Sequence, residues 1–101
     1  MRTTVERING KFTIKLQGRF DVSSHRAFRD SYAAGLGAQD VHEFEIDLNN
    51  VEYLDSSALG MLLMLREKAQ ASNQSVTLAN CSGTVKQILD VANFGRLFSM
   101  R

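Results

Sequence analysis

The chain has 101 residues, of which 44% are hydrophobic and 23% are charged, so it predicts a single globular domain spanning residues 1–101. Twelve basic residues against eleven acidic ones leave a formal net charge of +1, which gives no electrostatic reason to expect nucleic acid or an anionic membrane surface as a partner. The single cysteine, Cys81, excludes an internal disulfide and a cysteine-rich zinc site.

Neither a membrane span nor an export signal is predicted. The longest apolar run extends only from Ala58 to Leu65, far short of the about 20 residues that cross a bilayer. Residues 1–7 contain no apolar segment of the kind found in signal peptides. We therefore expect a soluble protein of the cytoplasm.

A β-hairpin is predicted near the start of the chain. Residues 5–8 and 11–16 form its two strands, and Asn9-Gly10 between them supplies the two positive-φ residues that a type I′ turn needs. Apolar and polar residues alternate along the second strand, which indicates one buried and one wet face.

A helix is predicted after this hairpin. Residues 18–21 break the strand alternation, and Ser23 or Ser24 can cap a helix that runs to about Ala34. The glycines of residues 35–37 then end it.

The middle of the chain predicts a second strand and the longest helix. Residues 44–48 alternate between apolar and polar, and Asn49-Asn50 is expected to turn out of the strand. Residues 51–54 are then a short connection or a continuation of the strand. The helix that follows covers residue 55 to about residue 72.

The last third completes an α/β pattern. Residues 76–79 predict a strand, Ser82 or Thr84 can cap a third helix that stops at Gly95, and residues 97–100 predict a last short strand or turn. Strands that alternate with helices after a hairpin predict one small α/β domain. Its mixed sheet should have about four to five strands, with about three to four helices packed on it.

The most informative stretch is the start of the longest helix, at Asp55-Ser56-Ser57. The first N–H groups of a helix have no partner within the helix, and the helix dipole is positive there. A serine in this place can cap the helix, or it can carry a phosphate that the helix end accommodates. Local chemistry alone favours the plain cap.

The whole chain resembles the STAS family, and specifically the bacterial anti-sigma factor antagonists. The resemblance rests on four blocks in the family order, with Ala58 where the family more often has glycine. They are the turn Gly18-Arg19-Phe20-Asp21; the central strand Ile46-Asp47-Leu48 with its exit Val51-Glu52-Tyr53-Leu54; the signature Asp55-Ser56-Ser57-Ala58-Leu59-Gly60; and the helix Val85-Lys86-Gln87-Ile88-Leu89-Asp90 with Phe94.

This resemblance implies a switch based on phosphorylation of Ser56. In the family, a partner serine kinase that is also the anti-sigma factor adds the phosphate, and a PP2C-type phosphatase removes it. The unphosphorylated form binds the kinase and releases the sigma factor. Related proteins use the same switch on other targets, such as a biofilm pathway, and the sequence does not separate these outputs.

The surroundings of Ser56 predict a phosphate acceptor and not an enzyme. Asp55 could orient the Ser56 hydroxyl, or it could simply favour the helix start, and Asp21 and Ser57 are expected nearby. Serine hydrolysis needs a base in hydrogen-bond reach and an oxyanion hole. The only histidines, His25 and His42, are expected to be solvated, and no cofactor or metal site is predicted.

One face of the longest helix is the candidate partner-binding surface, formed by Ala58, Gly60, Met61 and Met64. At 100° per residue the arc around Leu62 packs on the sheet, which places the two methionines on a face expected to be wet. A neighbouring helix could cover them instead. The rival function, of a different class, is a STAS module that senses a nucleotide or another small ligand at the same edge.

Overall fold

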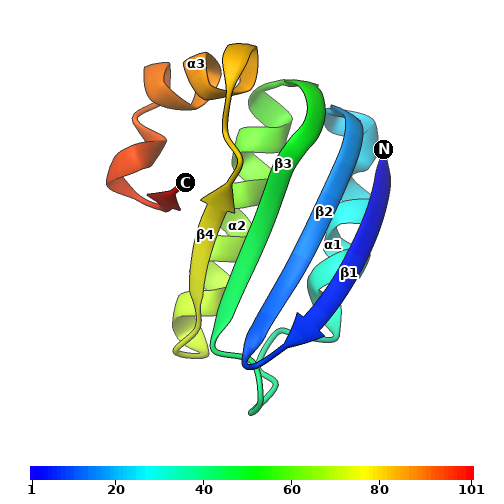
Figure 1. The fold of residues 1–101 in the computed structure, drawn as a ribbon, viewed down its shortest axis with the longest axis vertical. Helices are drawn as coiled ribbons and strands as arrows, with labels where there is room; N and C mark the ends of the chain where they lie inside the picture. The colour runs from blue at the N-terminus through cyan, green and yellow to red at the C-terminus, as the bar shows by residue number, and fades with distance from the viewer.

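The computed structural model describes residues 1–101 and contains one mixed five-stranded sheet (Figure 1). The strands lie in chain order, β1-β2-β3-β4-β5, and only the β1–β2 pair is antiparallel. Their bounds are β1 (Arg2–Ile8), β2 (Lys11–Phe20), β3 (Glu43–Leu54), β4 (Ser75–Ala79) and β5 (Ser99–Met100).

Two helices cover one face of this sheet, and a third lies beside the end of β3 (Figure 1). Their bounds are α1 (His25–Ala33), α2 (Ser56–Ala71) and α3 (Gly83–Val91), with short 3-10 turns η1 (Val22–Ser24) and η2 (Phe94–Arg96). The predicted α/β class with a mixed sheet is confirmed. None of the helices combines the length and the apolar character that a membrane crossing requires.

The predicted hairpin is confirmed, but β2 continues further than expected. Asn9 and Gly10 both have positive φ, 51° and 82°, as a type I′ turn requires. The expectation that the second strand ends near residue 16 and that residues 18–21 break its alternation is wrong, because β2 runs on to Phe20. Gly18 adopts a φ of 101° next to a shift in the pairing register, so a bulge takes up the irregularity without ending the strand.

β3 is likewise one long strand. The turn expected at Asn49-Asn50 is wrong, and the alternative of a strand continuation to Leu54 is correct. Because the extended β2 offers hydrogen-bonding partners, Asn50 pairs with Gln17 and Leu54 pairs with Phe20. Polar residues that favour a turn locally are therefore held in a strand by their neighbour.

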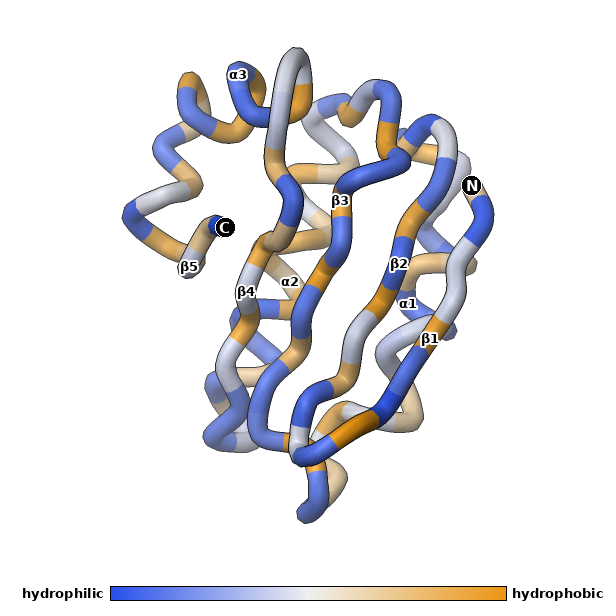
Figure 2. The backbone as a smooth tube through the Cα atoms, in the orientation of Figure 1, coloured by the Kyte–Doolittle hydropathy of each residue, from blue (hydrophilic) through white to orange (hydrophobic).

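The core lies between the sheet and the helices α1 and α2. Alternation along the strands, visible in Figure 2, turns one side chain in two toward the helices and leaves the opposite face polar. The largest fully buried side chains come from β2, α1, β3, α2, β4 and α3: Phe20, Phe28, Phe44, Ile14, Leu16, Ile46, Leu48, Leu54, Leu62, Leu65, Leu78 and Leu89.

A buried glutamine ties down the loop between α1 and β3. Gln74, which precedes β4, donates from its amide nitrogen to the carbonyls of Gly35 and Val41, at 3.0 and 2.9 Å. Its amide oxygen accepts from the Gly37 backbone N–H at 3.1 Å. These bonds satisfy a polar side chain that would otherwise be costly to bury.

Candidate functional site

The candidate site lies at the edge of the sheet where β2 and β3 end and where α1 and α2 begin (Figure 1). Two hydrogen bonds join these segments. The Asp55 backbone N–H donates to the Phe20 carbonyl at 3.3 Å, and the Val22 N–H donates to Asp55 Oδ2 at 3.2 Å. Parallel pairing of β2 with β3 therefore brings Asp21 and Asp55 to one edge, as expected.

Asp55 is the N-cap of α2. Its Oδ1 accepts a hydrogen bond from the Ala58 backbone N–H at 2.9 Å, and its own backbone is extended at φ −105°. The plain-cap interpretation of Ser56 is therefore wrong, because the aspartate already occupies the cap position. Both Asp55 carboxylate oxygens accept hydrogen bonds from backbone N–H groups, so Asp55 has the structural role of favouring the helix start.

Ser56 is the first residue of α2, and it is exposed. Its hydroxyl forms no hydrogen bond within the chain, since the cap bond belongs to Asp55. Ser57 follows and is half-buried, facing a hollow that it shares with Val22 and His25. The two adjacent serines thus point into different surroundings, with Ser56 the more accessible.

Asp21 organises the turn before α1. Its Oδ1 accepts from the Ser23 backbone N–H at 3.0 Å and from the Ser23 hydroxyl at 2.6 Å, and Arg19 lies 3.7 Å from Oδ2. The hydroxyl hydrogen bond is the main cause that lowers the pKa of Asp21 below its ordinary value. Asp21 and Asp55 therefore each fix a separate piece of backbone, and no three acidic, histidine or cysteine side chains gather to hold a metal ion.

The expected wet face of α2 is only partly exposed. Met64 is 45% exposed and Gly60 is also exposed, as expected. Met61 is 7% exposed and Ala58 is 0% exposed, so the expectation that their side chains are available to a partner is wrong. Helix α1 packs beside this flank of α2, and Met61 lies against α1 residues such as Phe28.

The two histidines occupy opposite ends of the sheet. His42 precedes β3, where its backbone N–H donates to the Gly10 carbonyl at 2.7 Å beside the hairpin turn. His25 is exposed in the first turn of α1 and lines the same hollow as Ser57, with no hydrogen bond to either serine. Neither is held in position as a base for Ser56.

The sequence did not single out a cation–π pair at the same edge. The Arg19 guanidinium lies over the Tyr53 ring, 4.7 Å from its centroid, and Tyr53 is exposed. These two residues face each other in the register of β2 and β3. Recognising this pair required the bulged strand register, which no local pattern shows.

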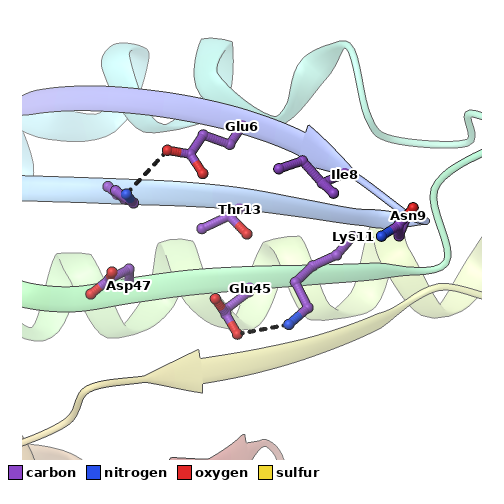
Figure 3. A pocket seen from close by; sticks show the side chains of 8 residues that line it. Glu6, Ile8, Asn9, Lys11, Thr13, Glu45 and Asp47 are labelled. Carbon is purple, nitrogen blue, oxygen red and sulfur yellow. Dashed lines mark hydrogen bonds and ion pairs between the residues drawn. The ribbon is translucent and has the colours of Figure 1, made fainter.

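The largest hollow on the molecule is elsewhere, on the open face of the sheet (Figure 3). It has about 380 Å³ and is lined by residues of β1, β2 and β3. Four of its five charged side chains are paired, since Lys11 lies 3.3 Å from Glu45 and Lys15 lies 3.1 Å from Glu6, and Asp47 accepts a hydrogen bond from the Asn80 amide at 3.0 Å. This paired, solvated surface is not part of the site at Ser56.

Comparison with known proteins places the chain among STAS domains. Residues 4–99 match the family model described as Mlab, STAS domain. A STAS-domain containing protein of Pseudomonas aeruginosa (strain UCBPP-PA14) is 48% identical over 90 residues, which cover 89% of this chain and 87% of the relative.

Solved structures show the same fold at low sequence identity. The anti-sigma factor antagonist SpoIIAA in its unphosphorylated form superposes with a TM-score of 0.77 at 19% identity, covering 99% of this chain and 87% of that one. The Bacillus cell fate determinant SpoIIAA in the phosphorylated form gives 0.75 at 18% identity, covering 99% and 91%. The fold therefore matches that of anti-sigma factor antagonists.

Proposed function

The chain belongs to the STAS-domain family, and on that premise we propose that it is a phosphorylation-controlled switch of the anti-sigma factor antagonist type. In the proposed cycle, the unphosphorylated protein binds a serine kinase that is also an anti-sigma factor. Phosphorylation of Ser56 releases the protein, and a PP2C-type phosphatase restores it. The cycle operates in the cytoplasm and requires no catalysis by this chain.

The observation that carries the proposal is the state of Ser56. Its hydroxyl is exposed at the first position of α2 and is not used by the fold, because Asp55 caps the helix in its place. Phosphorylation of this hydroxyl therefore breaks no hydrogen bond of the fold. The fold neighbour SpoIIAA is described in both unphosphorylated and phosphorylated forms, which supports the same chemistry here.

The transfer itself is an ordinary phosphoryl transfer to an alcohol. The Ser56 oxygen attacks the γ-phosphorus of the ATP held by the kinase, ADP leaves, and the hydroxyl proton passes to a base of the kinase. The product carries about −1.5 to −2 charges at pH 7. The first N–H groups of α2 and its dipole favour this charge, so the domain tolerates it.

The same charge acts on the interface. A partner surface shaped for a neutral hydroxyl meets an anion that must lose water on docking, which disfavours the complex. In this proposal Asp55 and Asp21 are positioning residues, because they fix the start of α2 and the turn at η1. Gly60 and Met64 contribute the exposed part of the docking face.

The modified residue is tested by phosphopeptide mass spectrometry after reaction with the cognate kinase. Ser56 should carry the phosphate and Ser57 should not, since Ser57 is half-buried in the hollow beside α1. Ser57→Ala is the matched control and should leave the modification intact. Dominant modification of Ser57 would refute the assignment.

The switch is tested by partner affinity in Ser56→Ala and Ser56→Asp. Ser56→Ala should bind as the unmodified protein does, because it presents a neutral surface. Ser56→Asp should bind more weakly, although one charge on a shorter arm blocks less well than a phosphate. Equal affinity in both variants and the wild type, with all three folded, would contradict the proposal.

A further inference from the structure

A hollow lies between η1, α1 and α2 beside Ser57, and a narrow crevice of about 10 Å³ between α1 and α2 shares His25, Met61 and Met64 with it. The hollow has about 340 Å³ and is lined by Val22, His25, Ser57, Gly60, Met61 and Met64. In the crevice, His25, Arg29 and Tyr32 of α1 face Met61 and Met64 of α2. We call the hollow and the crevice together the α1–α2 groove, with the hollow as its upper part.

The groove has an exposed apolar lining. Val22 is 68% exposed and Met64 is 45% exposed, and Met61 forms the floor beneath them. Methionine is a flexible, polarisable side chain that adapts to apolar partner groups. An apolar lining in a concave surface is better suited to receive a side chain than to face water.

The rim of the groove is positively charged and has no counter-charge. Arg29 lines it, and Lys68 stands over the ring of the lining residue Tyr32, with its Nζ 6.0 Å from the centroid. Neither of these two side chains forms an ion pair, and no aspartate or glutamate lines the groove.

The groove is a distinct feature of a nearly neutral protein. The formal net charge of the chain is only +1, and six of its twelve lysine and arginine side chains are paired with carboxylates, as Lys86 is with Asp90 at 2.8 Å. The other side chains without an ion pair, Arg2, Arg26, Arg66 and Arg96, line neither part of the groove. Unpaired cations around an apolar floor are complementary to a ligand with an apolar residue flanked by carboxylates. Ser57 and Gly60 line the upper part of the groove, so the groove is continuous with the proposed docking face.

We propose that the α1–α2 groove binds an acidic amphipathic helix of a protein partner, with an apolar side chain over Met64 and carboxylates toward Arg29 and Lys68. This proposal rests on the proposed function, because it takes the serine kinase of that function as the partner that carries the helix. Helix-in-groove recognition uses this combination of an apolar anchor and charged flanks. An anionic membrane is the weaker fit, since the surface is concave and carries fewer basic groups than the about four to eight of lipid-binding clusters.

The test uses the full chain, labelled for NMR, and two synthetic amphipathic peptides with equal leucine content. One peptide carries glutamates beside the leucines and the other carries lysines. We expect the acidic peptide to shift the signals of Met64 and Arg29 and to bind at least about tenfold more tightly than the basic one. Its affinity should fall as salt is raised.

Variants separate this site from general electrostatics. Arg29→Glu/Lys68→Glu should weaken binding of the acidic peptide about tenfold, because each exposed ion pair contributes a factor of about 1.5 to 5 and reversal adds repulsion. Arg2→Glu/Arg96→Glu changes the net charge equally at residues of β1 and η2 that line neither part of the groove, and it should leave binding unchanged. Melting curves check that both variants are folded.

Several results would overturn the proposal: equal binding of the two peptides, no binding of either, shifts confined to another face, or equal losses in the two variants. Binding to vesicles of phosphatidylglycerol in preference to the acidic peptide would assign the groove to a membrane. The peptide assay uses no kinase, so it stands apart from the switch. If the acidic peptide binds but the kinase does not phosphorylate Ser56, the groove proposal stands and the switch proposal is refuted. If the kinase phosphorylates Ser56 but the acidic peptide does not bind, only the groove proposal is refuted.

Discussion

Asp55 and Ser56 are neighbours whose removal should have very different effects on stability. Asp55→Ala removes the acceptor of the Ala58 N–H at 2.9 Å and the acceptor of the Val22 N–H at 3.2 Å. Loss of an N-cap costs about 0.5–2 kcal/mol, and loss of the negative charge at the helix start adds about 0.3–1 kcal/mol. Because these contributions overlap, we expect Asp55→Ala to lower the free energy of unfolding by about 1–2 kcal/mol.

Ser56→Ala should change the free energy of unfolding by less than about 0.5 kcal/mol, since its hydroxyl is exposed and unbonded. Asp55→Asn is the matched control. Asparagine is as good an N-cap as aspartate, but its nitrogen cannot accept from Val22, so it should fall between the wild type and Asp55→Ala.

Urea unfolding with a check that the slope is unchanged measures all three differences. In a domain of this size each kcal/mol corresponds to about 4–8 °C in melting temperature, so the Asp55→Ala loss is measurable by either method. If Ser56→Ala costs 1 kcal/mol or more while Asp55→Ala is nearly neutral, the serine is the cap and the reasoning about a free hydroxyl fails.

Two further substitutions test other parts of the site. Met64→Glu should leave the melting temperature nearly unchanged and weaken kinase binding, because Met64 is exposed. Met61→Glu should strongly lower the melting temperature, because it buries a carboxylate. Similar melting temperatures for the two variants would show that α1 does not cover Met61. Since the pKa of Asp21 is lowered in the folded state, its ionised form stabilises the fold above the unfolded-state pKa of about 3.9, and this contribution is lost as pH falls through the lower folded value. When the pH is lowered from 5 into the acid range, the free energy of unfolding measured by urea titration should therefore fall less in Asp21→Asn than in the wild type. Parallel plots of this free energy against pH would contradict the lowered pKa.

The sequence alone determined the features that depend on local chemistry. Asn9-Gly10 specified the hairpin turn, because few residues tolerate positive φ at two successive positions. The alternation along residues 11–16 and 44–48 identified which side chains face the core. The resemblance of the segment from Asp55 to Gly60 to a family signature indicated the site at Ser56 before any contact was known.

Only the tertiary structure decided the features that depend on a distant partner. Asn50 lies in a strand because β2 pairs with it, against its own turn preference. The two methionines of α2 look alike on a helical wheel, yet α1 covers Met61 and leaves Met64 exposed. Gln74 is buried because carbonyls from a loop more than 30 residues earlier satisfy its amide.

At the functional site, the N-cap of α2 also depends partly on local residue types and partly on a distant contact. Aspartate and serine are both good N-caps, so the residue types alone leave the cap ambiguous. The end of β3 holds Asp55 with extended backbone, where one carboxylate oxygen reaches the Ala58 N–H and the other reaches Val22 across the sheet edge. The long-range bond to Val22 fixes the orientation of that carboxylate, and this is why the serine beside it is free.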